Sequence, residues 1–185
     1  ELTGRRVGLL GLGHVNQRLI ELLQPFQAEI IAYDPYVDEE LVSTLGIVRG
    51  ELDAVLQHAQ ILVVQVPHTP RTEKMIGARE LDILGKGSII VNCSRGKVID
   101  QPALVKKVEA GDLIAGLDVF ETEPMPKEDP VRLMKNVVIS PHVAWYAPDS
   151  LHKYFTYLAE DMERFFAGEP LQHELTARMV EIRNG

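Results

Sequence analysis

Short apolar runs alternate with helical patterns along most of the chain, and this alternation limits the fold more than any other feature. The runs are rich in Val and Ile and rarely alternate with polar residues, which is typical of parallel strands covered on both faces. We predict strands at 6–10, 29–33, 61–66, 88–93, 114–120 and 136–140, and helices at 14–23, 39–45, 52–58, 78–84, 101–110 and 149–166. The pattern predicts an α/β fold: a doubly wound, Rossmann-type parallel sheet in three αβα layers.

Size and composition fit one globular domain spanning residues 1–185. Hydrophobic residues make up 45% of the chain and charged residues 25%, with a formal net charge of −8. This acidic balance disfavours nucleic-acid binding, which needs clustered Lys and Arg. No apolar run approaches the ~20 residues that span a bilayer. Because no secretory signal is present either, the sequence favours a cytoplasmic protein without membrane contact.

Several motifs fail on inspection. Cys93 is the only cysteine, which excludes an intrachain disulfide and a cysteine-based zinc site. The segment HELTA at 173–177 has Ala177 where a zinc metalloprotease needs its second histidine. The segment NCSRG at 92–96 has Asn92 where a nucleophile elbow needs glycine. We therefore expect no metal site and no hydrolase.

The segment GLGHVN at 11–16 follows the first predicted strand and opens the first predicted helix, as a dinucleotide-binding loop does. Gly11 would form the tight turn, and Gly13 would let the backbone approach a pyrophosphate. Asn16 stands where the third glycine allows close helix packing, so we expect altered packing with the anion site at the helix start retained. His14 either adds positive charge near the phosphates or is a solvated loop residue.

Asp34 closes the second predicted strand. A carboxylate at this place accepts hydrogen bonds from the adenosine ribose and repels a 2′-phosphate, which favours NAD over NADP. The alternative is that Asp34 and Pro35 only end a strand. Together the glycine loop and Asp34 predict NAD as the cofactor.

Three charged residues each follow a predicted strand, where the carboxyl ends of the sheet face a cofactor crevice. Arg95 has the planar donors to hold a substrate carboxylate. His142 suits proton transfer to a developing alkoxide, and Glu123 suits fixing the tautomer of that imidazole. Taken singly, each residue has an alternative explanation: Arg95 as a surface ion-pair partner, His142 as a packed histidine and Glu123 as a solvated loop acid. Jointly, they predict reduction of a 2-oxo acid.

The sequence resembles the coenzyme domain of the D-isomer-specific 2-hydroxyacid dehydrogenases. The segments GLG, YDP, VPHTPRT, VNCSRGKVID, LDVFETEP and SPHVAW occur in that family's order. The resemblance implies that Arg95, Glu123 and His142 are catalytic. It implies further cofactor contacts from the backbone of His14 and Val15 at the pyrophosphate, from Asp34 at the ribose, and from Pro67, Thr72, Cys93, Ser94, Arg95, Asp118 and His142.

Two further expectations follow from the comparison with the family. The stretch between Gly111 and Asp118 is one residue shorter than usual, which predicts a slight displacement of Asp118 and Glu123. The family also carries a second, substrate-binding domain, which we expect to be absent from this chain. Because closure of that domain excludes water, we expect this chain to bind NAD(H) with weak turnover or none.

The resemblance also covers corepressors that sense NADH, so a binding module is the alternative to an enzyme. The expected partners are a small 2-hydroxy or 2-oxo acid and a second copy of the chain, because the family forms homodimers. Which acid is the substrate stays open.

Overall fold

The computed structural model describes residues 1–184, without the side chains of residues 148, 178 and 182–184. The strands in this range are β1 (Arg6–Leu10), β2 (Glu29–Tyr33), β3 (Val48–Arg49), β4 (Ile61–Val64), β5 (Ser88–Asn92), β6 (Leu113–Leu117) and β7 (Val137–Ile139). The α-helices are α1 (His14–Leu23), α2 (Glu39–Leu45), α3 (Leu52–His58), α4 (Ala78–Ile83), α5 (Gln101–Glu109), α6 (Pro148–Ala167) and α7 (Ala177–Asn184). Short 3₁₀ helices lie at Gln24–Phe26, Gly96–Val98 and Pro130–Leu133.

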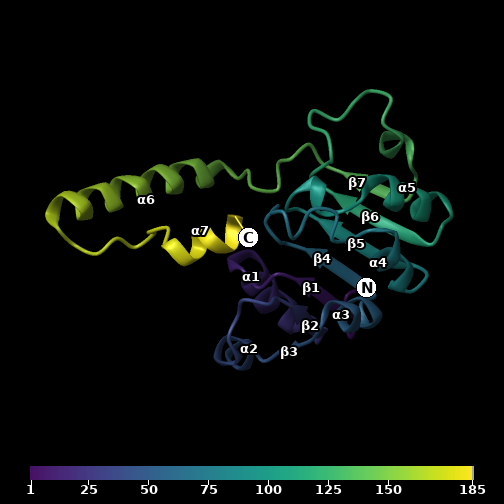
Figure 1. Cartoon of the computed structure of the whole chain (residues 1–185), viewed down its shortest axis with the longest axis horizontal. Coiled ribbons are helices and arrows are strands. Elements are labelled where there is room, and N and C mark those ends of the chain that lie inside the picture. The colour runs from purple at the N-terminus through teal and green to yellow at the C-terminus, as the bar shows by residue number, and fades with distance from the viewer. Residues whose placement is uncertain (185) are drawn as a thin grey trace.

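The strands form one parallel sheet in the order β3-β2-β1-β4-β5-β6-β7 (Figure 1). The order reverses between β1 and β4, which pair directly with Leu10 beside Val64. Ligands of doubly wound sheets bind at such a reversal, beyond the carboxyl ends of the strands. The predicted fold class is confirmed.

The core has two parts, one on each face of the sheet. Leu10 belongs to the larger part with Val55 of α3, Leu81 of α4 and Leu104 of α5. Its neighbour Leu9 points to the opposite face and packs with Ile20 of α1, because successive strand residues face opposite sides. Helices therefore cover both faces, as three layers require.

The helix ends follow local chemistry. The Asp100 carboxylate caps α5 by accepting a hydrogen bond from the Ala103 N–H at 3.0 Å, and Pro102 lies in the first turn. Gly111 follows the helix with φ +74°, a conformation that stops helices at low cost in glycine.

Element boundaries differ from the sequence prediction mainly at the carboxyl ends of strands. The predicted strands 61–66 and 114–120 are too long, because β4 ends at Val64 and β6 at Leu117. Val66 and Val119, beyond these ends, stay buried but belong to the loops that follow the strands. Two elements were missed, β3 and α7. Only two residues long, β3 offers no apolar run to detect.

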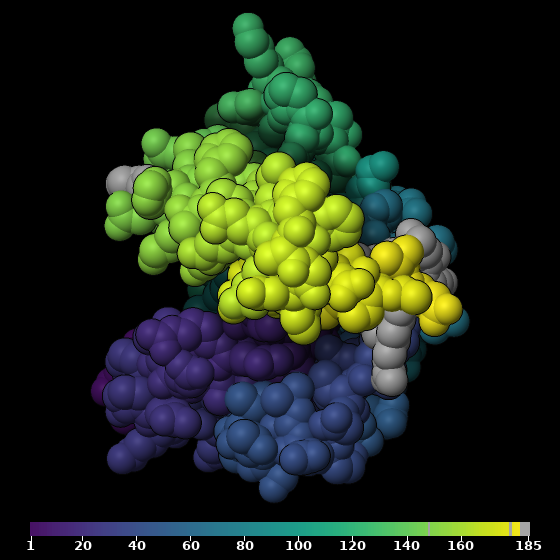
Figure 2. All heavy atoms as spheres, turned by 90° about the vertical axis from the view of Figure 1, so that its left-hand side faces the viewer, coloured from purple at the N-terminus to yellow at the C-terminus, as the bar shows by residue number. Residues whose placement is uncertain are grey.

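Helix α6 projects from the sheet domain (Figure 1), and none of its described residues is buried. Figure 2 looks from the side on which α6 projects and shows this helix, in yellow-green, in front of the rest of the chain. Its exposed apolar residues are Leu151, Tyr154, Phe155, Tyr157, Leu158, Met162, Phe165 and Phe166. In the part of the chain that the structure describes, no helix combines the length and hydropathy needed to cross a bilayer.

Candidate active site

The glycine turn after β1 is shaped by close backbone contact. Gly11 has φ +85°, and a Cβ at this position would lie 2.7 Å from the Gln65 carbonyl oxygen, so only glycine fits. A Cβ at Gly13 would meet nothing within 4 Å. Because α1 begins directly after Gly13, its unpaired first N–H groups border this open space, which suits a pyrophosphate.

Asn16 is buried and takes part in this turn. Its Nδ2 donates hydrogen bonds to the carbonyl oxygens of Gly11 at 2.6 Å and Leu10 at 3.3 Å. Its Oδ1 is buried without a partner among the described residues, which costs about 1–3 kcal/mol. The expected change in packing at position 16 therefore takes the form of hydrogen bonds to the turn. Helix α1 still buries Ile20 and Leu23, so it remains packed against the sheet.

Asp34 follows β2 and faces the same turn. Its Oδ2 accepts a hydrogen bond from the Leu12 N–H at 2.8 Å, and its Oδ1 accepts one from the Tyr36 N–H at 2.9 Å. Each oxygen keeps a lone pair for a ribose hydroxyl. Asp34 therefore does more than end a strand, since it also holds the glycine turn.

Two cavities adjoin along the carboxyl ends of the strands. The first, about 730 Å³, is lined by Gly11, Gly13, Asp34, Pro67 and Thr72, with Met179 of α7 at its edge. The second, about 840 Å³, is lined by residues from five segments: Val15, Gln65, Val66, Pro67, His68, Cys93, Ser94, Arg95, Asp118, His142, Ala144 and Trp145. Gln65, Val66 and Pro67 border both cavities, so the two form one continuous crevice.

The crevice gathers nearly all the predicted site residues. The exceptions are Glu123, which lines a separate cavity of about 570 Å³ together with His142, and His14, which borders an apolar hollow over β1, β4 and β5. Only the backbone of His14, at the start of α1, belongs to the anion site. Thr72 acts indirectly as well, because its hydroxyl donates a hydrogen bond to the Pro67 carbonyl at 2.6 Å and fixes that loop.

Arg95 is held at the crevice by the loop after β5. The buried Asn92 side chain donates a hydrogen bond to the Arg95 carbonyl at 3.0 Å and accepts hydrogen bonds from the N–H and hydroxyl of Ser94. The Arg95 guanidinium donates to the Ser94 carbonyl at 2.7 Å, and the residue is exposed. Asn92 was not predicted as a site residue, although a polar residue that ends an apolar, Ile-rich strand was the available signal.

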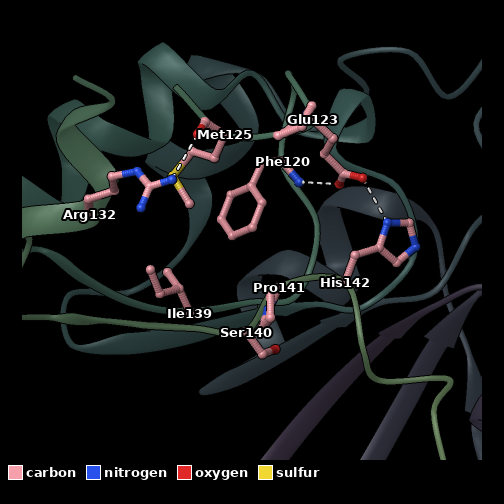
Figure 3. Close-up of a pocket in the computed structure, with 9 residues that line it drawn as sticks. Phe120, Glu123, Met125, Arg132, Ile139, Ser140, Pro141 and His142 are labelled. Atoms are coloured by element: carbon pink, nitrogen blue, oxygen red, sulfur yellow. Dashed lines mark hydrogen bonds and ion pairs between the residues drawn. The ribbon is translucent and has the colours of Figure 1, made fainter. Parts of the chain in front are cut away.

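Glu123 and His142 form the expected hydrogen bond, with 2.7 Å between Oε2 and Nδ1 (Figure 3). Burial alone would raise the pKa of Glu123, but hydrogen bonds from the Phe120 N–H and from His142, with the charge of Arg95 nearby, lower it overall. An ionised carboxylate only accepts hydrogen bonds, so it fixes a proton on Nδ1 of His142. Figure 3 shows Nε2 on the side of the ring away from Glu123, free for another partner.

Asp118 anchors the loop that carries His142. Its buried carboxylate accepts hydrogen bonds from the Ser140 hydroxyl at 2.6 Å, the Val143 N–H at 2.9 Å and the Ala144 N–H at 3.0 Å. Its carbonyl accepts the His142 N–H at 2.8 Å. Burial would raise the pKa of Asp118, and these hydrogen bonds lower it overall.

This anchoring has a conformational consequence. His142 has φ +55°, a left-handed conformation that costs a non-glycine residue about 1–2 kcal/mol and needs support from its neighbours. The contacts with Asp118 supply that support, a role that the sequence did not reveal.

The short stretch before Asp118 keeps its pairing with the neighbouring strands. Strand β6 keeps its register with β5, with Leu117 beside Asn92, and Ser140 N–H donates to the Leu117 carbonyl at 2.9 Å. Asp118 and Glu123 both contact the His142 loop, and a slight displacement of the two residues relative to the family stays a prediction. Within residues 1–184, no group of three His, Cys, Asp or Glu side chains is placed to hold a metal ion.

Comparison with known proteins agrees with this geometry. Residues 1–144 match the family described as "D-isomer specific 2-hydroxyacid dehydrogenase, NAD binding domain". The chain is 33% identical over 184 residues to glyoxylate reductase of Korarchaeum cryptofilum, covering 99% of this chain and 55% of that protein. It is 34% identical over 171 residues to D-3-phosphoglycerate dehydrogenase of Methanocaldococcus jannaschii, covering 91% and 32%.

A solved structure shows the same likeness. The NAD-complexed form of a D-isomer specific 2-hydroxyacid dehydrogenase from Lactobacillus delbrueckii ssp. bulgaricus superposes with a TM-score of 0.85 at 29% identity, covering 95% of this chain and 57% of that chain. The chain spans between about a third and just over half the length of these relatives. Their names are those of dehydrogenases and reductases, which does not favour the corepressor alternative. The chain belongs to the D-isomer specific 2-hydroxyacid dehydrogenase family, of which it is an NAD-binding domain.

Proposed function

We propose that this chain is the coenzyme domain of an enzyme that interconverts a small 2-hydroxy acid and its 2-oxo acid. The observation that carries the proposal is a single crevice in which Arg95 and His142 share the lining with loops that reach the glycine turn, with Glu123 hydrogen-bonded to His142. NAD(H) supplies the hydride exchange when bound. The protein residues supply binding, orientation and proton transfer.

Arg95 binds the carboxylate of the substrate. Its guanidinium is permanently charged and offers two parallel donors, which match a carboxylate better than a lysine would. The loop hydrogen bonds from Asn92 hold the backbone that carries it. When the substrate carboxylate is bound by Arg95, the adjacent 2-oxo carbonyl of the substrate lies within the same crevice as His142.

His142 transfers the proton. With Nδ1 donating to Glu123, Nε2 gives a proton to the substrate oxygen during reduction and takes it back during oxidation. Glu123 stabilises the imidazolium and keeps the ring oriented. Asp118 supports the same proton transfer indirectly, because it holds the His142 backbone in place.

Asp34 favours NAD over NADP in this chain. Its carboxylate borders the cavity at the glycine turn, where it accepts hydrogen bonds from ribose hydroxyls and repels a 2′-phosphate. Asp34 also accepts the Leu12 N–H, so the same group shapes the turn and selects the ribose.

A second domain completes the substrate site. Support comes from relatives that are up to three times as long as this chain and from the open crevice around Arg95, which is exposed. We expect the chain alone to bind NAD(H) and to turn over 2-oxo acids weakly or not at all, because Arg95 is exposed to solvent in the described part of the chain. Robust NADH oxidation with glyoxylate, pyruvate or hydroxypyruvate by this chain would contradict that expectation.

The binding half of the proposal is tested by titrating the chain with NADH. Trp145 is the only tryptophan and lines the crevice, so bound NADH, which absorbs where tryptophan emits, quenches its fluorescence. We expect saturable quenching. Absence of binding at millimolar NADH, confirmed by calorimetry, would end the proposal.

A matched pair of variants sharpens this titration. Gly13→Val adds a side chain where the free protein has space, so the fold is kept while the pyrophosphate is blocked. Gly77→Val is the control, since Gly77 also caps a helix and its Cβ would make only ordinary contacts. We expect Gly13→Val to lose NADH binding and Gly77→Val to keep it.

The proposed assembly is a homodimer in the cytoplasm. The exposed apolar residues of α6, including Phe165 and Phe166, support association, and a single cysteine suits a reducing compartment. Sedimentation at micromolar concentration distinguishes a dimer from a monomer.

A further inference from the structure

Two side-chain amides from α1 hold the carbonyl groups of the glycine turn. Asn16 Nδ2 donates to the Gly11 and Leu10 carbonyls, and Gln17 Nε2 donates to the Leu12 carbonyl at 2.7 Å. We propose that this amide pair, Asn16 and Gln17, positions the turn for the dinucleotide and sets the affinity for its pyrophosphate. The proposal rests on the assignment of the crevice as an NAD(H) site.

The physical reason lies in the planarity of the peptide group. In a trans peptide the N–H points opposite to the C=O, so a side chain that holds one carbonyl also aims the N–H of the next residue. By donating to the Leu12 carbonyl, Gln17 makes the Gly13 N–H of the same peptide unit point in the opposite direction. Among residues 1–184 the structure gives that N–H no protein acceptor, and Gly13 lines the cavity beside Asp34.

The neighbouring peptide is held from both ends. Asn16 holds the Gly11 carbonyl, while Asp34 accepts the Leu12 N–H of the same peptide unit at 2.8 Å. One peptide further back, the Gly11 N–H donates to the Tyr33 carbonyl at 2.8 Å. The three peptides of the turn are thus oriented before any ligand arrives, so binding does not have to order them.

The chemistry of position 16 separates this role from simple packing. Asn16 is 0% exposed and its Oδ1 has no partner in the described chain, so the side chain carries a cost to stability that alanine would remove. An aspartate in place of Asn16 would carry a carboxylate, which has no proton to donate to the carbonyl oxygens of Gly11 and Leu10. Alanine would also leave the Gly11 carbonyl without its amide donor, so the two effects on stability oppose each other. Loss of the amide should weaken pyrophosphate binding beyond any change in stability.

The experiment compares two ligands by calorimetry and by NMR titration of the chain. ADP-ribose carries the pyrophosphate, and adenosine carries only the part that meets Asp34. For Asn16→Ala we expect the Kd for ADP-ribose to rise about three- to tenfold, as for the loss of one net hydrogen bond, with the Kd for adenosine within about twofold of the parent chain. Gln17→Ala should behave alike and keeps the proposal testable if Asn16→Ala does not fold.

Asn136→Ala is the control, an exposed asparagine outside the crevice, and should bind both ligands like the parent chain. Unchanged ADP-ribose affinity in both Asn16→Ala and Gln17→Ala would overturn the proposal. An equal loss for ADP-ribose and adenosine would overturn it as well, because it would mark a merely structural role. Failure of the parent chain to bind either ligand would instead refute the cofactor site itself, and the proposal with it.

Discussion

Gly96 packs directly against the backbone of Phe120: a Cβ on Gly96 would lie 1.9 Å from both the carbonyl carbon and the carbonyl oxygen of Phe120. This contact joins the loop that carries Arg95 to the loop that carries Glu123. Because the obstacle is backbone, no rotamer change can relieve the overlap. Gly96 therefore sets the distance between two of the three charged groups of the site.

Gly96→Ala should separate these loops. We expect a loss of about 1–3 kcal/mol in the free energy of unfolding, as for overpacking of a close contact, measured by urea denaturation. Gly116→Ala is the matched control, because its Cβ would meet the Val91 side chain only at 3.8 Å. Equal free energies of unfolding for Gly96→Ala and the control would contradict this, because they would show that the loop after β5 can move away from Phe120 without cost.

Asp118→Asn should make stability less dependent on acid pH. The folded-state pKa of Asp118 is lowered, so between that pKa and the unfolded value of about 3.9 the unfolded chain binds more protons. The stability that this group contributes is complete above the unfolded pKa and is lost as pH falls through the folded one. We expect the variant to be less stable at pH 7, with a shallower loss of stability below pH about 4. Parallel pH profiles from urea unfolding would contradict this.

Glu123→Gln and His142→Ala separate catalysis from cofactor binding. In a protein that carries the proposed second domain, we expect kcat/KM to fall about 10²- to 10⁴-fold for His142→Ala, and by a smaller factor for Glu123→Gln, because proton transfer is lost or misoriented. The Kd of this chain for NADH should stay within about threefold. A Glu123→Gln enzyme with undiminished kcat/KM would remove Glu123 from the mechanism.

Asp34→Asn should relax the preference for NADH over NADPH. The amide oxygen still accepts the Leu12 N–H, while the negative charge that repels a 2′-phosphate is gone. We expect the ratio of Kd values, NADPH to NADH, to fall about tenfold, equivalent to about 1.4 kcal/mol. Asp38→Asn, a helix-capping carboxylate in the same loop, controls for a general change in charge. Equal ratios in the two variants would argue against selection by Asp34.

The sequence predicts those parts of the molecule that depend on burial and on the general geometry of parallel sheets. The Val- and Ile-rich runs locate six strands, and the rule that carboxyl ends face the crevice brings Arg95 and His142 together, with Glu123 hydrogen-bonded to His142. Strand ends are less predictable, because Val66 and Val119 stay buried after their strands have ended. Apolar character alone does not mark where pairing stops.

The positioning residues were beyond prediction for a related reason. Asn92 and Asp118 act through hydrogen bonds to loop backbone, and those partners become neighbours only once the loops have folded. The same holds for Asn16, whose role depends on carbonyl directions in a turn with positive φ at Gly11. Sequence spacing identifies the residue types of a site more readily than it identifies what holds them.

The most direct test of the account is a crystal structure of this chain with NAD(H) bound. We predict the pyrophosphate against the Gly11–Asn16 turn, the adenosine ribose on Asp34, and the nicotinamide in the cavity lined by Arg95 and His142, with Nε2 of His142 facing the ring. A dinucleotide bound elsewhere, or a nicotinamide on the other side of the sheet from His142, would contradict it.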